Sequence, residues 1–238
     1  MSEAKGRSGL VTLLAGAAGG AIAAVALAVA AVQGGWAGQI VRKAMLENPT
    51  ILVETADALR ENQFAPVLAA NRAALETPFG SSWQGAKDGD VTLVEFYDYA
   101  CGYCKASLPV IARLVKEDPK LKVVYREFPI LGPESEVAAR MALGASQSGR
   151  FMAFHDALYA AGRPSQPTLA KAAAAAGVPA AVPSSPEIDG ELRKNFQLAQ
   201  QLGATGTPLF IVGDKVLNGA VGYDALKKAI ADARAAKD

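Results

Sequence analysis

The chain has 238 residues, 51% of them hydrophobic, which is ample for the core of one domain of ordinary size with additional elements. Its 24 basic and 23 acidic residues give a net charge of +1 without a long run of either sign, so the composition favours neither nucleic acid nor a strongly charged substrate. The chain has two cysteines and one histidine. These are too few for an ordinary zinc site, and we predict no metal and no cofactor.

The segment from Leu10 to Val32 carries no charge, is long enough to span a bilayer, and follows Lys5 and Arg7. Its Ala- and Gly-rich composition and the small residues Ala28-Val29-Ala30 also suit a cleaved signal peptide. Residues 1–36 are therefore predicted to be a membrane anchor or a signal. A buried core helix is the weaker alternative, because the segment is uninterrupted and terminal. With an anchor or a signal, the rest of the chain is exported to a compartment where disulfides persist.

Residues 37–76 are predicted to form a short helical stalk of two or three helices, broken at Asn48-Pro49 and kinked or ended by Pro66. One apolar face has helical spacing and consists of Ile51, Leu52, Thr55, Ala56 and Leu59. Its partner is either the chain's own domain or other copies of the chain, and both interpretations stay open. The Gly-, Ser- and Pro-rich stretch 77–90 marks the boundary of the next domain.

The run Val91–Tyr97 predicts a central strand, because its residues are apolar on both faces with the exception of Glu95. The two cysteines follow in Cys101-Gly102-Tyr103-Cys104, and a helix over 105–115 comes next, with a kink at Pro109. Two intervening residues allow the thiols to form a disulfide on the first turn of a helix. The alternative, a structural disulfide, gains only about 2 kcal/mol from so short a loop, against more than about 4 kcal/mol for a 100-residue loop. The pair is therefore predicted to be a redox dithiol.

The remaining elements alternate between strands and helices. A second strand is predicted over 121–128, a largely helical block over 134–202, a hairpin over 209–218 with a turn at Gly213-Asp214, and a final amphipathic helix over 223–236. This order predicts a parallel strand–helix–strand unit whose sheet is extended by the antiparallel hairpin.

The chain resembles the thioredoxin superfamily, and within it the exported DsbA-like thiol-disulfide oxidoreductases. The resemblance covers residues 77–238 and rests on three motifs in the family's order: Glu95-Phe96-Tyr97-Asp98-Tyr99-Ala100-Cys101-Gly102-Tyr103-Cys104-Lys105, Phe154-His155-Asp156-Ala157-Leu158-Tyr159 and Gly203-Ala204-Thr205-Gly206-Thr207-Pro208. It implies an α/β thioredoxin fold with a helical subdomain inserted at about 134–202. The stalk also resembles the amino-terminal oligomerisation segments of the ScsC and Com1 branch.

The resemblance implies roles for the dithiol residues. Cys101 is the attacking nucleophile, at a helix amino terminus where thiol pKa values fall from about 8.5 into a range of roughly 3.5 to 7.5. Cys104 is the resolving thiol, which either releases the mixed disulfide or is regenerated as a disulfide. Gly102 and Tyr103 tune the redox potential, and because tyrosine is neutral at physiological pH we expect a mild oxidant.

Three further positions have a functional and a structural interpretation. Glu95, six residues before Cys101, is either a buried acid that relays the proton of Cys104 or a side chain turned to solvent by the pleat of its strand. Thr207-Pro208 resembles the family's cis-proline loop, which pairs with an extended substrate segment, although an ordinary strand-entry proline fits the same residues. His155 is expected to be a packing residue without a catalytic role.

These inferences predict a thiol-disulfide oxidoreductase that acts on unfolded or misfolded exported proteins and forms or isomerises their disulfides. The expected location is the periplasm, with the protein anchored to the inner membrane or released after signal cleavage. Its expected partners are the substrate proteins, a membrane or periplasmic redox partner, the membrane itself and other copies of the chain. The alternative is a membrane-tethered chaperone or binding module with a structural disulfide.

Overall fold

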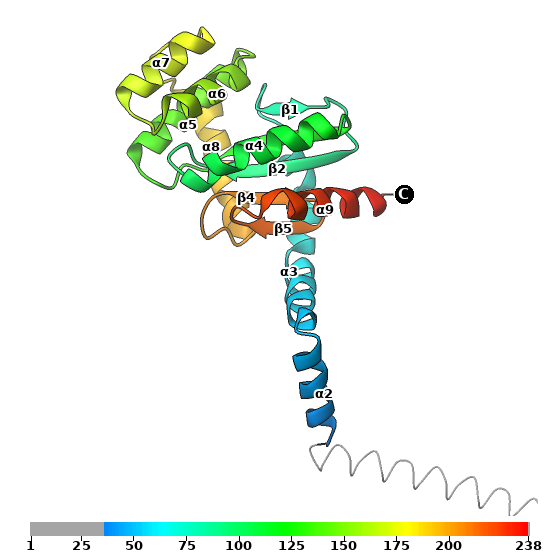
Figure 1. The fold of residues 1–238 in the computed structure, drawn as a ribbon. Coiled ribbons are helices and arrows are strands. Elements are labelled where there is room, and N and C mark those ends of the chain that lie inside the picture. The colour runs from blue at the N-terminus through cyan, green and yellow to red at the C-terminus, as the bar shows by residue number, and fades with distance from the viewer. Residues whose placement is uncertain (1–35, 238) are drawn as a thin grey trace, which may run out of the picture. The chain divides into compact units, whose positions relative to one another are not determined.

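A computed structural model describes residues 36–237, which divide into two units between Leu59 and Arg60. In its described part the first unit contains helix α2 (Trp36–Glu47) and the beginning of helix α3 (Thr50–Glu76), and the second unit contains everything that follows (Figure 1). The predicted anchor or signal, Leu10–Val32, lies outside the described residues. Within 36–237, no helix has the length and apolar character needed to cross a membrane.

The second unit is built on a five-stranded sheet with the order β1-β3-β2-β4-β5. Its strands are β1 (Trp83–Gly85), β2 (Val91–Tyr97), β3 (Leu121–Glu127), β4 (Leu209–Val212) and β5 (Lys215–Asn218). Strands β2 and β3 are parallel, and the other three pairings are antiparallel. The predicted central strand, strand–helix–strand unit and hairpin are confirmed. Strand β1 was not predicted, because a three-residue strand among glycines and serines has no recognisable alternation.

Six helices complete the unit: α4 (Gly102–Glu117), α5 (Pro133–Gln147), α6 (Phe151–Ala161), α7 (Gln166–Ala176), α8 (Pro186–Gln201) and α9 (Gly222–Ala235). Helix α4 joins the two parallel strands, and α5 to α8 form the predicted helical insertion between β3 and β4 (Figure 1). The joins between α6 and α7 (162–165) and between α7 and α8 (177–185) both contain proline. The thioredoxin-like α/β architecture with a helical insertion is thereby confirmed.

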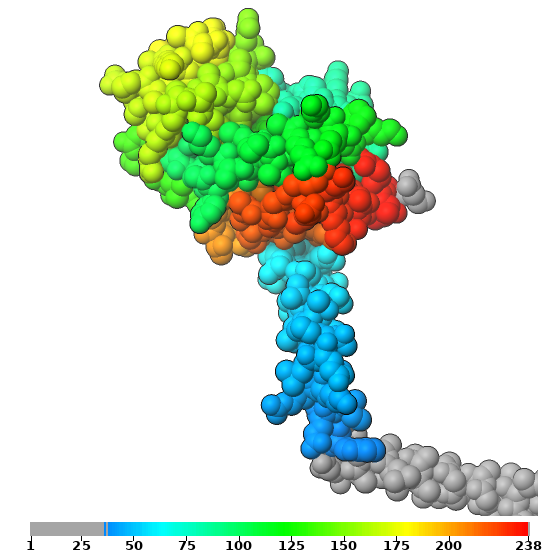
Figure 2. All heavy atoms as spheres, viewed as in Figure 1, coloured from blue at the N-terminus to red at the C-terminus, as the bar shows by residue number. Residues whose placement is uncertain are grey.

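The sheet has two differently covered faces. On one face, which we call the dithiol face, side chains of β2 and β3 pack with α4, α9 and the insertion; this core includes Leu93, Val123, Ile111, Phe154 and Leu226. On the other face, which we call the α8 face, they pack with α3 and α8; this core includes Val94, Phe96, Leu68, Leu75 and Leu198. Figures 1 and 2 show α4 and α9 on the near side of the sheet, and Figure 1 shows α8 and the end of α3 behind it. Because both faces are covered, β2 is apolar on both sides.

Helix α3 continues through Pro66, so of the two expected effects of this proline, a kink or an end of the helix, the end is excluded. Pro66 is on the exposed side of the helix, whereas Leu68 and Leu75 beyond it are fully buried against the sheet. Burial of these side chains offsets the single hydrogen bond that a proline removes. The part of α3 from residue 60 onward thus packs on the chain's own domain.

The first unit has a different character, because its helices expose large apolar side chains. These are Trp36, Ile40, Val41, Met45 and Leu46 in α2, and Ile51, Leu52, Val53 and Leu59 in the first turns of α3. The break between the two helices falls at Asn48-Pro49 as predicted.

Candidate active site

The dithiol lies at the amino terminus of α4. Cys101 is the N-cap residue, with extended backbone angles of φ −82° and ψ 118°, and its sulfur accepts the backbone N–H of Cys104 at 3.4 Å. Both cysteines are free thiols, with exposed fractions of 7% for Cys101 and 1% for Cys104. Between them, Gly102 is open to solvent and Tyr103 is 70% exposed. An incoming group therefore meets the edge of Cys101 and the side chain of Tyr103, while Cys104 stays beneath them.

The loop before β4 lies directly against the nucleophile. The Thr207-Pro208 peptide bond is cis, and the Cys101 thiol donates a hydrogen bond to the Thr207 carbonyl at 3.2 Å. Pairing of β4 with β2, in which Leu209 lies opposite Phe96, brings this loop to the end of the strand that leads to the dithiol. The sequence-predicted residues Cys101, Cys104, Thr207 and Pro208 thus come together from positions more than a hundred residues apart.

Glu95 is buried on the dithiol face, so the interpretation in which the pleat turns it to solvent is wrong. Its partners across the sheet are Tyr125 and Phe210, which belong to the same core. Burial raises the pKa of Glu95 well above its usual range, and the charge of Cys101 adds to this shift. Burial and the nearby Glu95 likewise raise the pKa of the Cys104 thiol far above that of a free thiol. A protonated acid and a protonated thiol therefore lie near each other under the nucleophile.

Asp98 holds the segment before the dithiol in place, a role that the sequence did not reveal. Its carboxylate accepts the backbone N–H groups of Ala100 at 2.7 Å and of Ile130 and Leu131 at 2.9 Å each, together with the Ser135 hydroxyl at 2.7 Å. Its carbonyl accepts the N–H of Cys101 at 3.0 Å. One buried side chain thereby ties the dithiol to the loop after β3 and to the start of α5.

A chain of buried polar groups lies on the same face. Glu127 accepts the hydroxyl of Tyr97, which lies 3.1 Å from the hydroxyl of Tyr99, and Tyr99 in turn lies 3.2 Å from Nδ1 of His155. Burial raises the pKa of Glu127 well above its usual range and lowers that of His155 to about 3, so burial favours the neutral form of both groups. His155 is packed among aromatic rings, as expected. Glu127 was missed, although two adjacent charges in an apolar strand were the available signal.

The α8 face carries a buried charge of a different kind. The side chain of Arg126 is fully buried and donates hydrogen bonds to the carbonyls of Ala74, Leu75 and Thr77 at the end of α3. It also forms an ion pair with Glu191 of α8. Each of the three guanidinium nitrogens of Arg126 thus donates to at least one acceptor. The side chain connects the end of α3 to α8.

Comparison with known proteins supports a redox site. A family model of the DSBA-like thioredoxin domain matches residues 92–231. A thioredoxin-like oxidoreductase from Silicibacter pomeroyi is 37% identical, with 69% of this chain and 98% of that chain covered at a TM-score of 0.65. A periplasmic thioredoxin-like protein from Salmonella enterica is 33% identical, with 69% of this chain and 95% of that chain covered at a TM-score of 0.63. The catalytic domain of Proteus mirabilis ScsC is 29% identical, with 71% of this chain and 97% of that chain covered at a TM-score of 0.65.

A shorter match connects the chain to a larger protein. A Na⁺/H⁺ antiporter of Salinispora arenicola is 33% identical over 79 residues, which are 32% of this chain and only 12% of the antiporter. The chain therefore spans a small part of that protein. The family model, in contrast, matches more than half of the chain, and it includes the dithiol, the helical insertion and the cis-proline loop. The chain belongs to the family of DsbA-like thioredoxin-domain proteins.

Proposed function

We propose that the protein is a thiol-disulfide oxidoreductase that forms or isomerises disulfides in exported proteins through Cys101 and Cys104. The observation that carries the proposal is the position of the Cys101 sulfur. It accepts a backbone N–H at the start of α4 and touches the carbonyl of Thr207, which precedes the cis-proline. A structural disulfide would need neither the helix terminus nor this carbonyl.

In the oxidising direction, the reaction begins with the disulfide between Cys101 and Cys104. A substrate thiolate attacks the Cys101 sulfur, the bond between the two cysteines breaks, and Cys104 leaves as a thiolate. A second substrate thiolate then attacks the substrate sulfur of the mixed disulfide and releases Cys101. The substrate loses two electrons to the dithiol, and a redox partner must remove them before the next cycle. Isomerisation uses the reduced dithiol, with Cys101 attacking a wrong disulfide and later being displaced.

Glu95 supplies the proton that the leaving Cys104 needs. Its raised pKa favours the protonated carboxyl group, and the raised pKa of Cys104 makes that thiolate a strong base. The proton therefore moves from the acid to the thiolate when the disulfide opens, and in the reverse direction when it closes. Gly102 and Tyr103 set the redox potential, because they are the two exposed residues between the cysteines at the start of α4.

Thr207 and Pro208 align the substrate. In this proposal an extended substrate segment pairs with the backbone of Thr207 as an added strand, next to the Cys101 sulfur. The exposed apolar residues of α2 and of the first turns of α3 serve self-association, since apolar side chains of this size gain from burial. Localisation in the periplasm is supported by the charge-free segment at 10–32 and by the Salmonella neighbour, which is described as periplasmic.

Trapping of covalent intermediates tests the proposal. Replacing Cys104 with alanine should leave substrate proteins attached to Cys101 in living cells. Dithiothreitol should release these proteins from the isolated adducts. The matched control replaces Cys101 with serine in the same background and should show no adduct. If no adduct forms and the reduction potential of the wild-type pair lies below about −300 mV, as for inert disulfides, the dithiol is structural and the proposed function is rejected.

A second experiment separates isomerase from oxidase. Deleting residues 39–59 removes most of the exposed apolar surface but leaves the part of α3 that packs in the core. If isomerisation needs several dithiols around one substrate, this deletion lowers the refolding of scrambled ribonuclease and leaves the oxidation of reduced peptides unchanged. Equal losses in both assays would contradict a special role of the first unit in isomerisation.

A further inference from the structure

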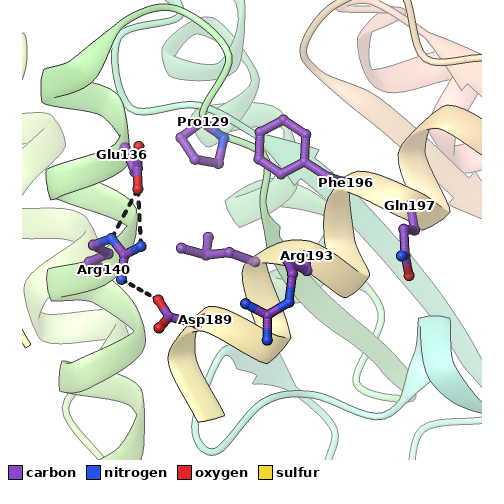
Figure 3. Close-up of a pocket in the computed structure, with 8 residues that line it drawn as sticks. Pro129, Glu136, Arg140, Asp189, Arg193, Phe196 and Gln197 are labelled. Atoms are coloured by element: carbon purple, nitrogen blue, oxygen red, sulfur yellow. Dashed lines mark hydrogen bonds and ion pairs between the residues drawn. The ribbon is translucent and has the colours of Figure 1, made fainter. Parts of the chain in front are cut away.

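The insertion contains a pocket that none of the roles above uses. It has a volume of about 380 Å³ and lies between α5 and α8, beside the loop that follows β3 (Figure 3). The residues that line it are Pro129, Glu136, Arg140, Asp189, Leu192, Arg193, Phe196 and Gln197. All of them belong to the second unit.

The pocket combines an apolar wall with a neutralised and a free positive charge. Pro129, Leu192 and Phe196 form the wall, and Phe196 is held by an edge-on contact with Phe128 at a centroid distance of 5.0 Å. Arg140 reaches from α5 to Asp189 of α8 at 2.6 Å and also binds Glu136 at 3.0 Å, as the dashed lines in Figure 3 show. Its charge is therefore compensated within the pocket.

Arg193 differs from Arg140, because it forms no ion pair or hydrogen bond with any residue of the described chain. It lies on α8 one turn after Asp189 and one turn before Gln197, so these residues share one stripe of the helix with Leu192 and Phe196. Arg140 already binds one oxygen of each carboxylate of the pocket, so Arg193 is the charged side chain of the lining that has no partner among the described residues. A carboxylate can bind the free guanidinium in a bidentate geometry.

Hydrogen bonds of Asp98 connect two of the segments that line this pocket to the dithiol. Pro129 precedes Ile130 and Leu131, whose N–H groups bind the Asp98 carboxylate, and Glu136 follows Ser135, whose hydroxyl binds the same carboxylate. The carbonyl of Asp98 accepts the N–H of Cys101. Ile130 and Leu131 themselves expose large apolar side chains, and they follow Pro129 of the pocket in the chain.

We propose that this pocket is a substrate subsite, which takes an aromatic or aliphatic side chain and a neighbouring carboxylate of the polypeptide held at Cys101. The inference rests on the proposed function, since it assigns a preference among the substrates of that dithiol. The apolar side chain covers Leu192 and Phe196, and the carboxylate binds Arg193. The protein then favours cysteines that are followed or preceded by an acidic and apolar segment.

Matched peptides test the subsite with the oxidised full-length protein. Each peptide contains two cysteines and one Phe-Glu, Phe-Gln, Phe-Lys or Ala-Glu pair, placed two to eight residues from a cysteine. The second-order rate of peptide oxidation is divided by the rate of the same peptide with oxidised glutathione, which removes differences in thiol reactivity. At low salt the wild-type protein should favour the best-placed Phe-Glu peptide over its Phe-Gln and Ala-Glu counterparts by roughly three- to fivefold. This preference should decrease in 0.5 M salt.

Substitutions at the free arginine make the test specific. Arg193→Gln should remove the preference for Phe-Glu over Phe-Gln, and Arg193→Glu should reverse it in favour of Phe-Lys. Arg163→Gln is the matched control, because it removes an exposed positive charge of the insertion outside the pocket and should leave the preference intact. All three variants should react with dithiothreitol at the wild-type rate, since none of them lies in the dithiol or its proton relay.

The possible failures are distinguishable. If the wild-type protein oxidises the peptides without a preference, or if Arg193→Gln retains it, the subsite is rejected and the proposed function stands. If no peptide is oxidised although all react with oxidised glutathione, both proposals are rejected. If Arg193→Glu changes the sedimentation of the protein but not its peptide preference, the pocket is part of a contact between copies of the chain, and the substrate subsite is again rejected.

Discussion

The two faces of the sheet bury charged groups for opposite purposes. On the α8 face, Arg126 is surrounded by three backbone carbonyls and a carboxylate, so its charge is compensated within the fold. On the dithiol face, Glu95 and Glu127 are buried with no positively charged partner among residues 36–237, and burial favours the protonated form of each. A compensated charge stabilises one arrangement of the chain. An uncompensated acid keeps a transferable proton, which is useful only where a reaction requires one.

Removing the compensated charge should have the largest effect. Arg126→Met leaves the buried Glu191 with only the partly exposed Lys194 as a partner and deprives the end of α3 of its donors. We expect the free energy of unfolding to fall by about 3 to 5 kcal/mol, the usual cost of breaking a buried pair. Urea denaturation measures this loss. The rate of thiol exchange per folded molecule should stay within about twofold of wild type, and a much larger fall would contradict the division between the two faces.

Replacing the proton-bearing acid should instead affect the reaction. Glu95→Gln keeps the shape of the side chain but cannot transfer a proton, so we expect opening of the disulfide by dithiothreitol to slow by about 10²-fold, the low end of usual acid–base contributions. Stopped-flow measurements between pH 5 and 9 should also show a changed pH dependence of this step. The wild-type protein should be the faster one, and equal rates would remove Glu95 from the mechanism.

Glu127→Gln is the matched control for this experiment. Glu127 is buried on the same face and its pKa is also raised, but its hydrogen bond goes to Tyr97 and not to the dithiol. Both acids bind protons more tightly in the folded state than at their unfolded pKa near 4.5, so each makes stability fall as the pH rises above about 4.5. Both substitutions should reduce this fall, but only Glu95→Gln should slow exchange. If Glu95→Gln and Glu127→Gln slow thiol exchange equally, the effect does not depend on a specific proton transfer from Glu95.

His155 should affect the pH dependence of stability in the direction opposite to that of Glu95 and Glu127. Burial lowers its pKa from 6.5 to about 3, so the unfolded chain binds a proton below pH 6.5 that the folded chain does not bind. The stability that neutral His155 contributes is present above pH 6.5 and is lost as the pH falls toward 3. His155→Phe should therefore lose less stability than wild type between pH 6.5 and 4, by on the order of 1 kcal/mol or more. Thermal unfolding over this pH range measures the difference, and parallel curves would contradict it.

Arg234 is partly exposed to water, so its ion pairs should contribute less to the free energy of unfolding than those of the buried Arg126. Arg234 donates to Asp90 at 2.8 and 2.9 Å and to Asp118 at 2.8 Å, and its side chain is 33% exposed, whereas that of Arg126 is fully buried. Arg234→Gln should lower the free energy of unfolding by no more than about 1 kcal/mol, and less at high salt. Urea denaturation at two salt concentrations measures this. A loss as large as that of Arg126→Met would show that burial is not what separates the two sites.

The sequence was sufficient for the elements that depend on local pattern. Strand β2, the start of α4 and the hairpin follow from alternation, cysteine spacing and turn residues close together in the chain. The resemblance added the approach of Thr207 to Cys101, which no local pattern contains. Strand β1 was missed because its three residues are defined by pairing with β3, not by their own composition.

The supporting residues of the site were not predictable for the same reason. Asp98 has polar partners at Ile130, Leu131 and Ser135, and only the fold brings these together. Arg126 finds its acceptors at the end of α3 and in α8, at sequence separations of 49 to 65 residues. A charged residue in an apolar strand indicates that some partner exists, but the sequence does not say which. Long-range polar contacts therefore set the limit of what could be inferred.

In the proposed function, the hydrogen bond from the protonated Cys101 thiol to the Thr207 carbonyl makes the docking of a substrate strand sensitive to the oxidation state. In the reduced protein the thiol's own hydrogen occupies the acceptor that an arriving polypeptide would use. A sulfur in a disulfide carries no hydrogen, so oxidation frees the carbonyl for the backbone of a client. Once the client has been oxidised and the thiol restored, the thiol competes for that carbonyl again. The same sulfur that exchanges electrons thus favours capture before the reaction and dissociation after it.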